Sequence, residues 1–351
     1  MNIGIIGFAR SGKSVLFSAF TGNRASSNGS VGIISVPDRR LESLSRLYKP
    51  KKTTFASVNF EDLLPLDAPA KQDRVKLSEE MKRMDAFVFV AGAWRCATPE
   101  DVLGEAEKVR LEVILNDLDF VLKRTERLER EMRLEPQNRA AKEQEMAVLQ
   151  RLQPNLENGR FLHDMEFDDS EQRFMTQFNL LSVKPACYVL NHGEGMEKEP
   201  AAALVSRMET FLRGMGDLSP VLALNGQLES EIAALDPGEI DEFLRQYGIG
   251  ELGRDTLIRK AYELLHLITF FTVGQDECRA WNIPSGGTAL DAARAIHTDL
   301  ARGFIRAEVI PHDALLQFGS LSEARRAGAL RLEGKSYVVK DGEIVHIMFN
   351  V

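Results

Sequence analysis

Eight residues near the start of the chain have the types and spacing of a phosphate-binding loop. Residues 7–14 read Gly-Phe-Ala-Arg-Ser-Gly-Lys-Ser, which fits the pattern G-x-x-x-x-G-K-[ST]. Two glycines let the backbone turn its N–H groups toward phosphate oxygens, the lysine brings a positive charge, and the last hydroxyl is a ligand for magnesium. We therefore predict nucleotide binding, with phosphate contacts from Gly7, Ala9, Arg10, Ser11, Gly12, Lys13, Ser14 and Val15.

An arginine is unusual inside such a loop. Arg10 could fold toward the phosphates and supply a second positive charge. The alternative, which we favour from the sequence, is an exposed side chain that points into solvent.

A second polar group follows an apolar run in the middle of the chain. Residues 186–190 read as a buried strand, and Asn191-His192-Gly193-Glu194 come next. Guanine-specific P-loop proteins carry Asn-Lys-x-Asp here, and the Asp carboxylate accepts from guanine N1 and N2. This chain has the longer Glu194 and no lysine, so the pattern predicts a site near the base but does not assure guanine specificity. The alternative is an ordinary polar turn.

The elements that position these residues alternate between strands and helices. Residues 2–7, 86–91, 186–190 and 220–224 are apolar runs typical of strands covered on both faces, and residues 13–20 read as a helix. This pattern predicts a doubly wound α/β domain. Residues 74–84 also read as a helix.

The stretch from about 100 to 158 has a different pattern. Leucines recur at roughly heptad spacing among many charges, which predicts an antiparallel helical hairpin, plausibly a coiled coil, inserted into the α/β domain; two ordinary surface helices are the alternative. Beyond 267 a small strand-rich α+β domain follows. The predicted domains are residues 1–98 with 181–265, the insertion 99–180, and the C-terminal domain 266–351. The heptad positions are Leu111, Leu115, Leu118, Leu122, Thr125, Leu128 and Met132.

Composition sets limits on the class of protein. The chain has 351 residues, a formal net charge of −8 and three widely spaced cysteines, which predicts a reducing cytoplasm and no disulfide framework. No apolar run is long enough to span a bilayer, and because the phosphate loop starts at the seventh residue we expect no signal peptide. Two locally basic runs, within residues 39–52 and 123–133, could contact RNA phosphates; in the second, a solvated helix face is the alternative.

Longer strings connect the chain to a known family. The segments 36–41, 262–272, 279–281, 296–299 and 303–309, with the terminal Phe349-Asn350-Val351, resemble the YchF subfamily of Obg-like P-loop NTPases, a translation-associated group. The resemblance covers almost the whole chain. It implies a Ras-like P-loop nucleotide domain, an inserted helical hairpin and a C-terminal TGS domain with a β-grasp fold. It also implies ATP or GTP with Mg²⁺ as ligands and the ribosome as a partner, and we expect a monomer.

The same resemblance assigns site residues. Asn191, His192 and Glu194 are expected at the base, with Asn225 and Gly226 closing over its other side. The family's D-x-x-G motif aligns with residues 62–65, so Asp62 is expected to reach magnesium through water. Lys13 and Asp62 are then the candidate catalytic residues.

The chain departs from its family at the end of that motif. Residues 62–65 read Asp-Leu-Leu-Pro, and Pro65 has no N–H to donate to a γ-phosphate. We therefore expect slow hydrolysis that switches ribosome or partner contacts. The alternative is an inert nucleotide-binding protein. A metabolic kinase would need an acceptor-substrate domain, which the sequence does not indicate.

Overall fold

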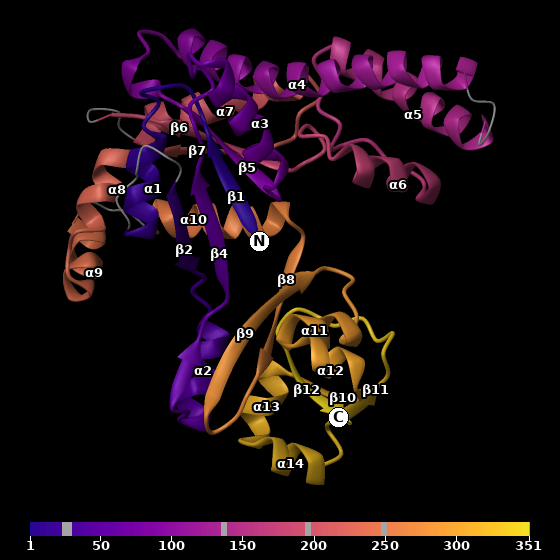
Figure 1. Cartoon of the computed structure of the whole chain (residues 1–351). Coiled ribbons are helices and arrows are strands. Elements are labelled where there is room, and N and C mark those ends of the chain that lie inside the picture. Colours follow the sequence, from indigo (N-terminus) through magenta and orange to yellow (C-terminus); the bar gives the residue numbers. More distant parts are fainter. Residues whose placement is uncertain (23–29, 135–138, 194–197, 247–250, 351) are drawn as a thin grey trace. The chain divides into compact units, whose positions relative to one another are not determined.

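The computed structural model describes residues 1–351 except for 23–29, 135–138, 194–197, 247–250 and 351 (Figure 1). Contacts between Cα atoms divide the chain into two compact units. The first is Met1–Ile33 with Asn59–Lys260, and the second is Ile34–Val58 with Ala261–Val351. The described residues form two six-stranded sheets.

The sheet of the first unit has the strand order β2-β4-β1-β5-β6-β7. From β4 to β7 each neighbouring pair is parallel. Every residue of β5 and β6 is buried, as expected for parallel strands covered on both faces. The predicted doubly wound α/β fold is confirmed. The strands are β1 (Asn2–Ile6), β2 (Ser30–Ser35), β4 (Ser57–Asp62), β5 (Ala86–Ala91), β6 (Ala186–Asn191) and β7 (Val221–Leu224).

Helices connect these strands, so the carboxyl ends of the parallel strands meet at one edge of the sheet. This edge is the usual ligand site of a doubly wound fold. Between strands of this sheet, outside the long insertion, lie α1 (Lys13–Thr21), α3 (Lys71–Lys82), the 3₁₀ turn η1 (Ala93–Arg95) and α7 (Lys198–Gly214). After β7 come α8 (Gly226–Ile232), α9 (Pro237–Gln246) and α10 (Gly253–Leu264).

The long insertion is helical. Helices α4 (Pro99–Leu134) and α5 (Arg139–Glu157) lie side by side, and α6 (Asp169–Phe178) follows them (Figure 1). The predicted heptad was wrong in detail, because Leu111, Leu115 and Leu122 are exposed. Helix α4 packs on β5 and α7 as well as on α5, so its buried face is set by the sheet and by α7 as well as by its partner in the hairpin. The buried apolar positions of α4 are Val102, Ala106, Val109, Val113, Ile114, Val121 and Leu128.

The second unit has the strand order β11-β10-β12-β8-β9-β3. β12 and β8 pair in parallel at its centre, as in the predicted β-grasp fold. The strands are β3 (Lys52–Thr54), β8 (Leu267–Thr272), β9 (Glu277–Pro284), β10 (Phe304–Pro311), β11 (Arg331–Glu333) and β12 (Glu343–Phe349). The helices are α2 (Arg39–Tyr48), α11 (Ala289–Ile296), α12 (Thr298–Arg302), α13 (His312–Phe318) and α14 (Leu321–Arg326).

The segment 34–58 differs from the predicted domain boundaries, which placed it in the nucleotide domain. β3 pairs in parallel with β9, and Leu41 and Leu44 are fully buried in a cluster with Phe271 and Ile310. Sheet pairing and apolar burial together explain why this segment belongs to the C-terminal unit.

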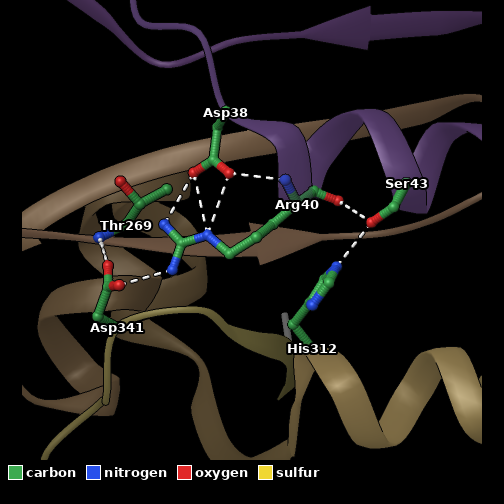
Figure 2. A network of polar contacts seen from close by, with 6 residues as sticks. All are labelled: Asp38, Arg40, Ser43, Thr269, His312 and Asp341. Atoms are coloured by element: carbon green, nitrogen blue, oxygen red, sulfur yellow. Dashed lines mark hydrogen bonds and ion pairs between the residues drawn. The ribbon is translucent and has the colours of Figure 1, made fainter.

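Polar contacts at the start of α2 add to this attachment (Figure 2). The Arg40 guanidinium donates to both carboxylate oxygens of Asp38 and to Asp341 Oδ2 at 2.6 Å. The other oxygen of Asp341 accepts from the backbone N–H of Thr269 at 2.9 Å. Burial works to lower the pKa of Arg40, but the hydrogen bonds to the two carboxylates outweigh it and keep this pKa above its ordinary value.

Candidate functional site

The phosphate loop connects β1 to α1, as predicted. Gly12 has a φ of +89°, and a methyl group there would lie 1.9 Å from Asn191 Nδ2. A methyl group at Gly7 would lie 2.7 Å from the carbonyl oxygen of Val90. Both positions therefore require glycine. The first N–H groups of α1, at Lys13 and Ser14, have no partner within the helix and are available to an anion.

Lys13, Ser14 and Asp62 converge at the start of α1. Lys13 Nζ donates to Asp62 Oδ1 at 2.6 Å and to the carbonyl oxygen of Leu63 at 2.7 Å, and Ser14 Oγ donates to Asp62 Oδ2 at 2.6 Å. Lys13 and Asp62 are 8% and 5% exposed. Because the ion pair is buried, removal of either partner would leave the other as an uncompensated buried charge.

The donor set fits a magnesium ion that arrives with a nucleotide. The Ser14 hydroxyl and the Asp62 carboxylate are hard oxygen ligands within hydrogen-bond distance of each other. Magnesium takes one or two such ligands and completes its shell with water and phosphate oxygens. Among the described residues, no group of three or more His, Cys, Asp or Glu side chains could hold a metal ion by itself.

A pocket of about 360 Å³ opens in front of the loop. Residues of the loop and of α1 form one wall, and the segment after β4 forms another. Pro65 lies in this second wall, where the family's motif places a glycine. The lining residues are Ala9, Arg10, Gly12, Lys13, Ser14, Val15, Asp62, Leu63, Leu64 and Pro65. Gly7 and Ser11 lie in the same loop outside this lining.

Asn191 lies at the end of β6 and joins two loops. Its Nδ2 donates to the carbonyl oxygen of Ser11 at 3.0 Å, and its Oδ1 accepts from the N–H of Gly226 at 2.9 Å. A methyl group at Gly226 would lie 2.9 Å from that oxygen. The Asn191 amide therefore fixes the phosphate loop against the turn that follows β7.

The other predicted base residues have local partners or lie outside the described part. Asn225 is the N-cap of α8 and accepts from the N–H groups of Gln227 and Leu228. His192 Nδ1 lies 3.1 Å from the carbonyl oxygen of Gly193. Glu194 lies outside the described residues.

The sequence did not predict three side chains that fix the backbone of the phosphate loop at Ala9, directly or through one another: Asp67, Arg95 and Glu105. The N–H of Ala9 donates to Asp67 Oδ1 at 2.8 Å, and Arg95 Nη1 donates to the carbonyl oxygen of Ala9 at 2.9 Å. Glu105 on α4 accepts from Arg95 Nη2 at 2.8 Å and from the N–H of Gly92 at 2.9 Å. Their spacing in the sequence, across 38 residues, gave no motif to find.

Trp94 is a second omission. It is 53% exposed on η1, directly after β5. A methyl group at Gly12 would lie 3.8 Å from Trp94 Nε1, and one at Gly193 would lie 3.3 Å from Trp94 Cβ. The signal in the sequence was a tryptophan shortly after the apolar run 86–91, because the carboxyl end of such a strand lies at the ligand edge of a doubly wound sheet.

The cysteines of this unit are poor candidates for chemistry. Burial, with the nearby Glu105 carboxylate, raises the pKa of the Cys96 thiol. Burial raises the pKa of Cys187 to about 12. Because the thiolate is the nucleophile, neither residue is activated at neutral pH.

Comparison with known proteins identifies the family of the chain. The family model YchF-GTPase_C, described as a protein of unknown function, matches residues 267–350. A ribosome-binding ATPase YchF of Bacillus subtilis (strain 168) is 35% identical over 100% of both chains. A protein of the same name from Pasteurella multocida (strain Pm70) is 35% identical over 99% of both chains.

The fold agrees as well. A solved structure of the Schizosaccharomyces pombe YchF GTPase matches with a TM-score of 0.85 at 22% identity, and covers 99% of this chain and 97% of that one. Among the residues that the structure describes, no helix has the length and apolar character needed to cross a membrane. The identity to full-length relatives establishes that this chain belongs to the YchF family of P-loop NTPases.

Proposed function

We propose that this chain binds ATP or GTP together with magnesium in the pocket in front of residues 7–14. The observation that carries the proposal is the convergence of the Lys13 ammonium and the Ser14 hydroxyl on the Asp62 carboxylate. A cation for phosphate, a hydroxyl ligand and a carboxylate are the three groups that a P-loop NTPase brings together around a metal-bound triphosphate.

The residues have separate roles in this proposal. Lys13 turns from Asp62 to the outer phosphates, and Ser14 and Asp62 become available to the metal, Asp62 through water. Magnesium neutralises phosphate charge when bound. The backbone N–H groups at the start of α1 bind phosphate oxygens.

The base binds at the adjacent carboxyl ends of β6 and β7. In this proposal Asn191, His192 and Glu194 lie on one side of the base. Asn225 and Gly226 lie on its other side. Because both amide atoms of Asn191 have backbone partners, its main contribution is to position the two loops. Trp94 adds a flat apolar surface of the kind on which a base stacks.

Ribosome association is the second part of the proposal. The relatives that match over their full length are named ribosome-binding ATPases. We infer that this chain also works on the ribosome in the cytoplasm, through the hairpin and the C-terminal β-grasp domain. Cosedimentation with purified ribosomes, with and without nucleotide, tests this part.

Hydrolysis is slow in this proposal because Pro65 cannot donate a hydrogen bond to the terminal phosphate. The competing function is nucleotide binding without turnover, and the same residue favours it. Release of phosphate in a single-turnover assay, absent in Lys13→Ala, excludes the inert protein.

Calorimetry with ATP, GTP and their diphosphates, each with and without magnesium, tests the binding site. We expect saturable binding to the native protein and a loss of about 10- to 100-fold in affinity for Lys13→Ala, since a buried charge-assisted contact is removed. Lys123→Ala, an exposed lysine on α4 paired with Asp119 in the same helix, is the control. Equal affinity in native protein and Lys13→Ala contradicts the site.

A further inference from the structure

The backbone of Arg10 has a conformation that its residue type does not favour. The loop makes a turn in which the N–H of Ser11 donates to the carbonyl oxygen of Phe8 at 3.2 Å. Arg10 is the third residue of this turn and has a φ of +64°, where glycine or asparagine is usual. The other described non-glycine residues with positive φ each follow a helix: Lys49, Asn179 and His266.

Contacts from outside the loop impose this conformation. Ala9, the residue before Arg10, is fixed through its N–H by Asp67 and through its carbonyl by Arg95. Arg95 in turn is paired with Glu105, whose side chain is 11% exposed. The N–H and the carbonyl group of Ala9 are therefore both fixed by hydrogen bonds, and the next residue, Arg10, adopts the positive φ that the turn requires.

Arg10 is one of the residues that line the phosphate pocket. Lys13 and Ser14 lie in the same lining, and Leu64 and Pro65 lie in the wall after β4. Within the described part of the chain, Arg10 is exposed and has no hydrogen bond or ion pair with a side chain. A guanidinium without a carboxylate partner, at the edge of an anion-binding pocket, is free to bind phosphate oxygens through two N–H groups.

We propose that Arg10 contacts the terminal phosphate of the bound triphosphate and replaces the hydrogen bond that Pro65 cannot make. The inference rests on nucleotide binding at residues 7–14 and adds how the triphosphate is distinguished from the diphosphate. An arginine supplied by the same chain stabilises the charge that develops during phosphoryl transfer. In that step a water oxygen bonds to the γ-phosphorus, the bond to the β–γ bridging oxygen breaks, the diphosphate leaves, and the proton of the water passes to phosphate or solvent.

Three substitutions at Arg10 separate the effect of its positive charge from the effect of its backbone conformation. Arg10→Ala removes the guanidinium and keeps a Cβ at positive φ, whereas Arg10→Gly removes the guanidinium and relieves the backbone conformation. Arg10→Lys keeps a charge without the planar fork. The control is Arg213→Ala on α7, an exposed arginine paired with Glu209 in its own helix.

Affinities for ATP and ADP with magnesium, and single-turnover phosphate release, are measured for each protein. We expect Arg10→Ala and Arg10→Gly to lose about 10- to 100-fold in ATP affinity while ADP affinity stays within about twofold, as one charge-assisted hydrogen bond predicts. Any phosphate release falls by about 1,000-fold or more. Arg10→Lys recovers part of the ATP preference, and Arg213→Ala behaves as the native protein.

An unchanged ratio of ATP to ADP affinity in both neutral variants overturns the inference and leaves the proposed binding site intact. Equal losses for ATP and ADP also overturn it, because they show a general effect on the loop. If the native protein binds neither nucleotide, the proposed function itself fails, and this inference fails with it.

Discussion

Pro65 is the residue at which this chain differs most in chemistry from the motif it matches. It lines the pocket opposite the phosphate loop and has no N–H. At the same scale, Gly12 and Gly226 are needed because the Asn191 amide approaches their backbone closely. The missing N–H of Pro65 and the missing Cβ atoms of the two glycines thus limit which contacts a nucleotide can make at this site.

Restoring a donor at Pro65 should change how the terminal phosphate is sensed. We expect Pro65→Gly to raise the preference for ATP over ADP by about 10- to 100-fold, because the new N–H can bond the γ-phosphate. Calorimetry with both nucleotides measures it. Pro69→Gly makes the same change at an exposed position outside the pocket lining; if both variants respond alike, chain flexibility rather than the missing donor is responsible.

At the scale of elements, α2 and β3 are attached to the C-terminal sheet although they precede it by more than 200 residues. Leu41 and Leu44 supply apolar burial, and Arg40 supplies the polar attachment to Asp341 on the turn before β12. A methyl group at Gly342 would lie 2.8 Å from Arg40 Nη1, so the turn is shaped around the guanidinium.

Removing this attachment should weaken the second unit. Arg40→Ala leaves two carboxylates without their shared partner, and we expect the free energy of unfolding to fall by about 1–2 kcal/mol, since the side chain is partly exposed. Urea unfolding measures it, and hydrogen exchange should show reduced protection of α2. Arg46→Ala on the same helix, whose side chain is 80% exposed, should cost much less. Equal effects would mean that the contacts of Arg40 with Asp38 and Asp341 add nothing of their own to stability.

At the scale of the whole molecule, the sequence predicted the P-loop fold, the C-terminal domain and the hairpin segment. Each of these has a local signal: the run of residues 7–14, the apolar strands, or long family-like strings. The buried face of α4 and the attachment of segment 34–58 were not predicted, because both depend on packing against residues distant in the chain. The contacts of Ala9 were missed for the same reason.

A nucleotide bound in front of residues 7–14, as proposed, would lie near Trp94, so the fluorescence of this tryptophan can report binding. The chain has two tryptophans, so Trp281→Phe leaves Trp94 as the only one, beside Gly12. In that background, titration with ATP and magnesium should change the Trp94 emission with a saturable curve, and the same titration of Lys13→Ala should give no change over that range. An equal change in both proteins, or no change while calorimetry detects binding, would contradict a nucleotide bound at this loop.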